Sequence, residues 1–550
     1  MKRSLISLIF LWLSWIALNA QPASHPSPAL SRQDFTPIQS FLSSDWMEGR
    51  EAGARGGFMA ADYISSMMKL NGLIPYGDAD RSGKQGSLHP PSRTWFQNFE
   101  VMCFQVEKSS LALIQGSPEG ESELSFTRGI DYEVAPVPSG SEGETQVVFA
   151  GYGIEAPGKK YNDYNLTNVR NQIVVIVDGF PGHADTTSPA WKKLGRDFSN
   201  EYADLSAKLR VAEKHGAVAL IVINPGDTVN PYHLTPVNLE VVTSAMNSPK
   251  PAEPEYEDPE HYLPGDTGLV KIPCFRLGIA ATRLLLNGTG IDLPGFEIKA
   301  AREMTTASGV MHGKKLRFSV TIKQEPLMVR NVLGIITGSD TSRYIIVGAH
   351  YDHLGTRKGV IYNGADDNAS GVSGMLALSG VWANHQEKPS CNIIFAAWTA
   401  EEKGLLGSDY FSRHTPIIPD RLSVVINMDM ISRSASDDTA RRVISIGTLP
   451  FSEDLKNIAS RSNSQLEHPF TLDLWDVTGH SGSDYAPFAA RKIPVMTFFS
   501  GFHDDYHTPR DVASKADPEK MEKILKIVND CLRENTEKPA VKSSEPHSAR

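Results

Sequence analysis

Four short, mainly apolar runs in the C-terminal half of the chain constrain its fold more than any other feature. They cover residues 344–349, 392–399, 422–427 and 493–499. A run of this length is typical of a β-strand buried on both faces, as in a parallel sheet between two layers of helices. The pattern therefore predicts an α/β fold with a mixed, mainly parallel central sheet flanked by helices.

Each of the four runs is followed closely by histidine or carboxylate side chains. These are His350 and Asp352 after the first run, Glu401 and Glu402 after the second, Asp429 after the third, and His503 and His507 after the fourth. In open α/β sheets, ligands bind beyond the carboxyl ends of the strands. Because imidazoles and carboxylates are ligands of divalent metals, the sequence predicts a metal site at this edge of the sheet.

A polar loop, residues 363–371, lies between the first two runs and adds Asp366 and Asp367. A pair of metal ions that shares one water needs about five ligands, of which one bridges the ions. The chain supplies such a set in the order His350, Asp367, Glu402, Asp429 and His507. By spacing alone, Asp366 is an alternative to Asp367. His503 competes with His507 in the same way.

The length, net charge and cysteines of the chain limit its number of domains and its classes of partner and cofactor. A chain of 550 residues exceeds what one hydrophobic core usually holds, so about two or three domains are expected. The formal net charge of −10, without a basic stripe, argues against nucleic acid as a partner. The four cysteines are scattered along the chain and form neither a zinc nor a redox motif.

The N-terminus has the pattern of a secretory signal peptide over residues 1–20. Lys2 and Arg3 precede an apolar stretch, residues 5–18, that is too short for a comfortable membrane span. We therefore expect an exported protein, periplasmic or extracellular, without a membrane span. At the other end, residues 536–550 are rich in Lys, Glu, Ser and Pro, and a disordered tail is expected there.

Residues 135–300 differ in character from the rest of the chain. Gly and Pro interrupt their short apolar strands, and none of these strands ends in a cluster of His and carboxylates. This range is predicted to be a separate inserted domain with no chemistry of its own. The flanking ranges, 21–134 and 301–535, are then the N-terminal part and the main part of the domain that carries the predicted metal ligands.

Five short motifs, in this order, carry a resemblance to a known family. They are His350-Tyr351-Asp352-His353, residues 364–371, Ala400-Glu401-Glu402, Asn427-Met428-Asp429 and Tyr506-His507-Thr508-Pro509. The set resembles the co-catalytic zinc aminopeptidases of metallopeptidase family twenty-eight, of the bacterial leucyl aminopeptidase and aminopeptidase Y type. The resemblance extends to residues 44–53 and, through Gly151-Tyr152-Gly153, to a protease-associated domain inserted before the catalytic motifs.

The resemblance implies a zinc exopeptidase fold that holds two zinc ions, with a role for each ligand. Asp367 would bridge the two ions. His350 and Asp429 would bind one of them, and Glu402 and His507 the other. The same resemblance implies a cis peptide bond after Asp367.

The resemblance also implies roles for residues beside the ligands. Asp352 would orient His350, and Glu401 would be the general base that later returns the proton to the leaving amine. His353 is expected to make a local hydrogen bond rather than to bind metal. The family often has histidine where this chain has Tyr485, which leaves the role of that residue open.

Together these implications predict an exported exopeptidase that hydrolyses the N-terminal bond of peptides through a metal-bridging hydroxide. Its substrates are peptides with a free N-terminus. A carboxypeptidase or dipeptidase on the same scaffold is the alternative if an arginine faces the site to meet a substrate carboxylate. The candidates are Arg433, Arg441, Arg442 and Arg491. A non-catalytic, receptor-like homologue is a further alternative, against which the complete ligand set argues.

Overall fold

The computed structural model describes residues 30–80, 92–117, 120–195, 204–223, 260–266, 269–477 and 482–538. Within these residues the chain forms two compact units. The first unit combines the described residues up to Glu100 with those from Met328 onward. The second unit lies within Val101–Leu327.

The second unit is wider than the range 135–300 that the sequence predicts for an inserted domain. The chain enters this unit within β2 (Phe96–Ser117) and leaves it within β12 (Ser308–Ile336). Because each strand is continuous across a boundary, no change of composition marks where one unit ends and the other begins.

The sheet of the first unit is mixed and mainly parallel. Besides the end of β12, its strands are β1 (Ile74–Pro75), β13 (Asp340–His350), β16 (Cys391–Trp398), β17 (Leu422–Met428), β18 (Val443–Thr448), β19 (Thr471–Asp476) and β20 (Val495–Phe499). They lie in the order β19-β18-β20-β17-β13-β16-β12, and β1 pairs with β12. The pairs from β16 through β13 and β17 to β20 are parallel, as is β18 with β19. The pairs β12 with β16 and β18 with β20 are antiparallel.

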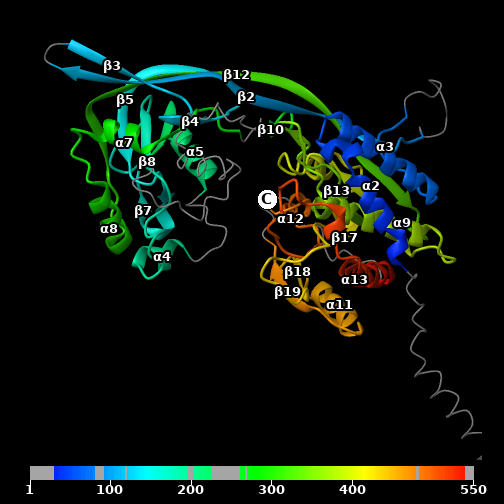
Figure 1. Cartoon of the computed structure of the whole chain (residues 1–550). Helices are drawn as coiled ribbons and strands as arrows, with labels where there is room; N and C mark the ends of the chain where they lie inside the picture. Colours follow the sequence, from blue (N-terminus) through cyan, green and yellow to red (C-terminus); the bar gives the residue numbers. More distant parts are fainter. Residues whose placement is uncertain are drawn as a thin grey trace, which may run out of the picture. The chain divides into compact units, whose positions relative to one another are not determined.

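Helices cover this sheet, as Figure 1 shows for α9 and α13 beside β13 and β17. The α-helices are α2 (Thr36–Leu42), α3 (Arg55–Leu70), α9 (Gly371–Ala383), α10 (Leu406–His414), α11 (Glu453–Ser464), α12 (Ala486–Ala490) and α13 (Pro518–Glu537). Short helical segments are η1 (Arg32–Asp34), η2 (Asp45–Arg50), η4 (Ala365–Ser370), η5 (Pro419–Arg421) and η6 (Ala513–Lys515). A small hairpin joins β14 (Thr356–Arg357) and β15 (Val360–Ile361).

Alternate residues of the central strands pack into two different cores. Ile345 and Val347 of β13 face a core that α3, α9 and α13 complete, whereas Ile346 faces a second core with α10 and α12. Because helices cover both faces, the central strands are mainly apolar along their length instead of alternating between apolar and polar residues. The predicted fold class, a mixed and mainly parallel sheet flanked by helices, is confirmed.

The second unit has a smaller sheet with its own helices. Its strands are β3 (Gly120–Phe126), β4 (Tyr132–Ala135), β5 (Ser141–Ala150), β6 (Glu155–Ala156), β7 (Tyr161–Asn162), β8 (Ile173–Val177), β9 (Ala219–Ile223), β10 (Glu260–Tyr262) and β11 (Cys274–Leu277). Its helices are η3 (Pro157–Lys159), α4 (Pro189–Leu194), α5 (Leu205–Lys214), α7 (Ile279–Leu286) and α8 (Leu293–Glu303). Strands β5, β8, β9 and β11 are parallel neighbours. Helices α4, α7 and α8 pack on one face of this sheet and α5 on the other.

The two ends of the chain bear on two further predictions. The predicted signal peptide, residues 1–20, lies outside the described residues. At the other end, α13 continues to Glu537, so the tail predicted to be disordered over residues 536–550 begins as helix. The helix extends this far because Asn535 and Thr536 are buried rather than exposed. Residues 539–550 lie outside the described residues. In the described part of the chain, no helix has both the length and the apolar character that a membrane crossing requires.

Candidate metal centre

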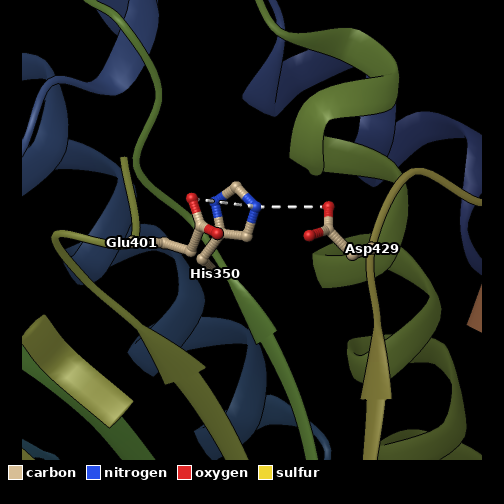
Figure 2. A group of neighbouring side chains, drawn as sticks. All are labelled: His350, Glu401 and Asp429. Carbon is tan, nitrogen blue, oxygen red and sulfur yellow. Dashed lines mark hydrogen bonds and ion pairs between the residues drawn. The ribbon is translucent and has the colours of Figure 1, made fainter. Parts of the chain in front are cut away.

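Three neighbouring parallel strands bring the predicted ligands to one edge of the sheet in the first unit. β13 ends at His350, β17 ends one residue before Asp429, and the turn after β16 carries Glu401 and Glu402. β13 pairs with both β16 and β17, so the three carboxyl ends lie side by side. Figure 2 shows the imidazole of His350 between the carboxylates of Glu401 and Asp429. His350 Nε2 is 3.3 Å from Asp429 Oδ1 and 4.0 Å from Glu401 Oε2.

Asp367 reaches the same place from η4, a loop with a closely packed backbone. The peptide bond between Asp367 and Asn368 is cis, as the family resemblance implies. Asn368 ties the loop to the end of β17, because its Nδ2 donates a hydrogen bond to Met428 O at 3.0 Å. Gly364, just before the loop, has a φ of +55°, and a Cβ there would lie 2.1 Å from Asp367 O. The loop therefore requires glycine at this position.

Asp367 lies between two histidines, with one carboxylate oxygen toward each. Its Oδ1 is 3.4 Å from His350 Nε2, and its Oδ2 is 3.1 Å from His507 Nε2. Glu402 Oε2 lies 3.2 Å from the same nitrogen of His507. The five predicted ligands thus form two groups, His350 with Asp429 and His507 with Glu402, that share Asp367. The side chain of His507 is 36 % exposed, the largest fraction among the five, although its Nε2 is buried.

The two residues that compete by spacing, Asp366 and His503, pair with each other instead. Asp366 Oδ2 is 3.3 Å from His503 Nε2. Asp366 Oδ1 accepts hydrogen bonds from the N–H and the hydroxyl of Ser432, at 2.7 and 2.8 Å. Neither residue occupies the position between His350 and His507 that Asp367 takes.

Asp352 and His353 both contact the ligands, although in different ways. Asp352 accepts the backbone N–H of Glu401 at 3.1 Å and so holds the turn that carries both glutamates. Its carboxylate is 3.9 Å from His350 Nδ1, whereas its backbone carbonyl oxygen is 3.2 Å from that atom. Asp352 therefore contacts His350 chiefly through its backbone. His353 Nδ1 lies 2.7 Å from Glu402 Oε1, so it contacts a predicted ligand directly.

Burial and neighbouring charges strongly perturb these groups. Burial raises the pKa of Glu401 well above its usual range, although His350 opposes the shift. Burial likewise disfavours ionised Glu402, but His507 outweighs it and holds the Glu402 pKa well below its usual range. Burial lowers the pKa of His507, but Glu402 and Asp367 outweigh it and raise that pKa to about 11. Such a strongly negative environment favours a bound cation.

Three buried residues around this site have no role assigned from the sequence: Arg50, Asp484 and Asp511. Arg50 belongs to the segment 44–53, which the family resemblance includes without implying a role for this residue. Burial raises the pKa of Asp484 to about 7, with His350 opposing the shift. Asp511 Oδ2 accepts the backbone N–H of Asp367 at 3.1 Å and so helps to fix the loop. A carboxylate whose hydrogen bonds come from backbone N–H groups has no complementary residue type that would mark it in the sequence.

Tyr485, whose role the sequence leaves open, is a packed side chain. It is 5 % exposed, and its ring lies edge-on to that of Trp475, with 6.0 Å between the ring centroids. Burial raises its pKa to about 12, so it stays protonated at neutral pH.

By distance alone, two sets of three donor atoms are close enough to hold a metal ion, and both sets include His350. One consists of His350, Glu401 and Asp429, and the other of His350, Asp367 and Glu402. Within each group the donor atoms lie within 4.8 Å of one another. Imidazole nitrogens and carboxylate oxygens are the donors that catalytic zinc takes, so the residues present fit this metal. The first group includes Glu401, so both glutamates lie close to the position of a metal ion.

Comparison with known proteins relates this arrangement to a family. The family model described as "Peptidase family M28" matches residues 331–532, a range that contains all five predicted ligands. A relative named "Probable glutamate carboxypeptidase", from Arthroderma benhamiae, is 25% identical over 45% of this chain and 36% of its own length. "Aminopeptidase NAALADL1" from Mus musculus is 31% identical over 41% of this chain and 33% of its own length. The chain spans about a third of the length of the curated relatives it matches.

A solved structure extends the likeness beyond the matched range. An aminopeptidase from Aneurinibacillus sp. strain AM-1 matches with a TM-score of 0.55 and 18% identity, over 92% of this chain and 93% of its own. At this identity the match shows a shared fold. The resemblance drawn from the motifs is confirmed for residues 331–532, the range that matches the model of Peptidase family M28.

Proposed function

We propose that this protein is a two-zinc aminopeptidase, which removes residues from the N-terminus of peptides. The observation that carries the proposal is the position of Asp367. Its two carboxylate oxygens face two histidines, at 3.4 Å from His350 Nε2 and 3.1 Å from His507 Nε2. A carboxylate that faces two ligand groups in this way suits a bridge between two metal ions.

The remaining ligands complete the two groups. His350 and Asp429 would hold one zinc ion, and Glu402 and His507 would hold the other. When bound, such a pair supplies an activated water and polarises the carbonyl of the bond to be cleaved. Asp352 would keep Glu401 and Glu402 in place through the backbone N–H bonds it accepts at 3.1 and 3.4 Å.

Glu401 is the residue proposed to move the proton. Its side chain is 13 % exposed, and its Oε2 is 4.0 Å from His350 Nε2, so it lies beside the ligands and is still within reach of solvent. Burial raises its pKa well above its usual range, which brings a carboxyl group closer to the pKa of an effective general base near neutral pH. Glu401 would take a proton from the attacking water and return it to the leaving amine.

The arginines favour an aminopeptidase over a carboxypeptidase. Three of the four that could meet a substrate carboxylate already contact carboxylates of the protein. Arg433 Nη2 is 2.9 Å from Asp505, Arg441 Nη1 is 3.5 Å from Asp517, and Arg491 Nη2 is 3.3 Å from Asp409. The site itself is rich in carboxylates, which suits a substrate with a free amino group. The printed name of the Arthroderma relative keeps a carboxypeptidase as the alternative.

Two further parts of the proposal concern the rest of the chain. Residues 1–20 would direct export to the periplasm or the cell exterior. The second unit would be a protease-associated domain that leaves the chemistry to the first. This assignment is supported by the location of all five proposed ligands outside Val101–Leu327.

One experiment tests the proposal and separates it from its alternatives. A peptide is offered in three forms, namely with both ends free, N-acetylated and C-amidated, and zinc bound per chain is measured in parallel. An aminopeptidase cleaves the free and C-amidated forms but spares the N-acetylated one. Cleavage of the N-acetylated form alongside resistance of the C-amidated form would establish a carboxypeptidase. No cleavage of any form would favour a receptor-like homologue.

A further inference from the structure

Arg50 is a buried arginine near the metal site. The residue is 0 % exposed and belongs to η2, which lies in the N-terminal part of the first unit. A charged side chain is almost never buried this fully unless its donors and its charge are satisfied. Arg50 therefore needs an explanation that the turn-like sequence around it does not provide.

The guanidinium group of Arg50 donates to four backbone carbonyl oxygens. Nε donates to Tyr351 O at 2.7 Å, and Nη2 donates to Gly364 O at 2.8 Å. Nη1 donates to Leu42 O and Asn363 O, both at 2.7 Å. Tyr351 follows the ligand His350, whereas Asn363 and Gly364 lead into the loop that carries Asp367. One side chain thus connects two ligand-bearing segments that are separate in sequence.

The backbone beside Arg50 strengthens the same connection. The carbonyl oxygen of Arg50 accepts the N–H of His353 at 3.3 Å, and that of Gly49 accepts the N–H of Gly355 at 3.0 Å. Gly49 has a φ of +69°, and a Cβ there would lie 2.4 Å from Gly355 O. The close approach of the two segments therefore depends on glycine at this position.

Arg50 also brings a positive charge to a site rich in carboxylates. Burial lowers its pKa to about 10, while Asp367, Asp511 and Asp352 oppose the shift. The guanidinium consequently stays charged at neutral pH. Its donors bond to carbonyl oxygens rather than to these carboxylates, which leaves the ligand oxygens available to metal ions.

We propose that Arg50 is a positioning residue of the metal centre, which fixes the segments of His350 and Asp367 relative to each other. The residue lies outside the range 331–532 that matches the family model. The inference rests on the proposed function in that it takes these two side chains as zinc ligands. It adds an N-terminal residue that touches neither a ligand side chain nor the reacting atoms.

The test compares Arg50→Met and Arg50→Lys with a nearby arginine at the start of α3. Arg55→Met is the control, because the Arg55 side chain is 76 % exposed and contacts Glu48 at 3.1 Å. Zinc affinity is measured on the full chain by competition with a chelator, without any peptide. Arg50→Met is expected to bind zinc about 10- to 100-fold more weakly, as for other residues that orient metal ligands. Arg50→Lys should lie between it and the wild type, and Arg55→Met should match the wild type.

Two further readouts separate positioning from general stability. With zinc in excess, the Arg50 variants should lower kcat while KM changes little, because Arg50 does not contact the substrate. Protein loaded with Co²⁺ should show an altered visible spectrum in Arg50→Lys and an unaltered one in Arg55→Met, since the spectrum reports ligand geometry. If the wild type binds zinc but cleaves no peptide, the proposed function fails while the affinity test of Arg50 still stands.

The proposal has clear ways to fail. Zinc affinity within about twofold of the wild type in a folded Arg50→Met would overturn it, since orienting residues typically matter by tenfold or more. Should Arg50→Met not fold, Arg50→Lys decides the matter by the same criterion. Loss of the fold in both variants would make Arg50 a general stabilising residue and would equally reject the specific role.

Discussion

Both units gather charged side chains where parallel strands end, but they satisfy those charges differently. In the second unit, Asp178 follows β8 and accepts a hydrogen bond from Arg276 Nη1 at 2.8 Å. The buried Lys208 of the same unit donates through Nζ to the carbonyl oxygen of Gly179. Asp178 and Lys208 thus both find their partners within the protein. In the first unit, the carboxylates at the strand ends meet imidazoles, with Arg50 as a buried cation nearby.

This contrast indicates which of the two units needs a bound cation to balance its buried charges. A buried charge is tolerated only when it is paired or hydrogen-bonded, and Asp178 and Lys208 of the second unit find such partners within the protein. In the first unit, Asp367, Glu402 and Asp429 surround two histidines that are neutral when they bind metal. The excess of negative charge there is a reason to bind divalent cations. Removing a strand-end carboxylate should therefore have different consequences in the two units.

The largest effect is expected for Asp367→Ala, which removes the carboxylate shared by both ligand groups. It should deplete zinc at both positions and lower turnover at least as much as loss of a general base, by about 10²-fold or more. Zinc analysis and hydrolysis of a small amino-acid amide check this, with His507→Ala expected to weaken mainly one position. Asp178→Ala is the control and should keep both zinc and activity. Near-normal zinc in Asp367→Ala would move the bridging role to Asp366.

A different outcome is expected for Glu401→Gln, which keeps the shape of the site but removes the proposed proton carrier. Turnover should fall by about 10²- to 10⁴-fold, the range for loss of a general base. Zinc content should stay at the wild-type value, whereas Glu402→Gln should lose zinc. If Glu401→Gln is the variant that loses zinc, the two glutamates have exchanged roles. The closeness of Glu401 to His350 and Asp429 makes that outcome worth testing.

Much of this site follows from the sequence, for a physical reason. The strands of the first unit are covered on both faces, so they appear as apolar runs, and the polar residues directly after them must lie at one edge of the sheet. That reasoning brings His350, Glu402 and Asp429 together. The choice of Asp367 over Asp366 needed the family resemblance, because adjacent residues in a loop have no periodicity that separates them.

Other features were beyond the reach of sequence patterns. Arg50 binds backbone carbonyl oxygens roughly three hundred residues away, and every residue has a carbonyl, so no complementary residue type marks its partners. The boundaries of the second unit fall inside continuous strands. The predicted disordered tail begins as helix because Asn535 and Thr536, although polar, are buried by packing.

A moderate effect is expected when the second unit is removed. The residues on either side of it are neighbours within the first unit, where Leu333 N donates to Trp95 O at 2.8 Å. A short flexible linker between Glu100 and Met328 should therefore leave a folded protein that still binds two zinc ions. Cleavage of a small amino-acid amide should fall by no more than about 10²-fold, the size of a slight misplacement of reacting groups.

The same deletion also tests the division of roles between the units. Selectivity among longer peptides should change more than cleavage of the small amide, since insertions of this kind often carry specificity. If the shortened protein folds and holds zinc but cleaves nothing, the second unit completes the active site, and the proposed separation of roles is wrong.

The smallest effect is expected for Lys208→Met, which should change stability but neither zinc nor activity. Burial lowers the pKa of Lys208 to about 8, although Asp178 and Asp163 oppose the shift. In the unfolded chain a lysine has a pKa of about 10.4, so between about pH 8 and about pH 10.4 the unfolded state holds more protons. The free energy of unfolding of the wild type should therefore increase by up to about 1.4 kcal/mol per pH unit across this window.

Lys208→Met lacks this increase, so denaturant unfolding at about pH 8 and about pH 10 should show the wild type becoming more stable relative to the variant. Lys214→Met, on the same helix but at a side chain that is 67 % exposed, should show no such trend. A difference between wild type and Lys208→Met that is independent of pH would mean that Lys208 is not a buried cation with a lowered pKa, and the contrast between the two units would lose part of its support.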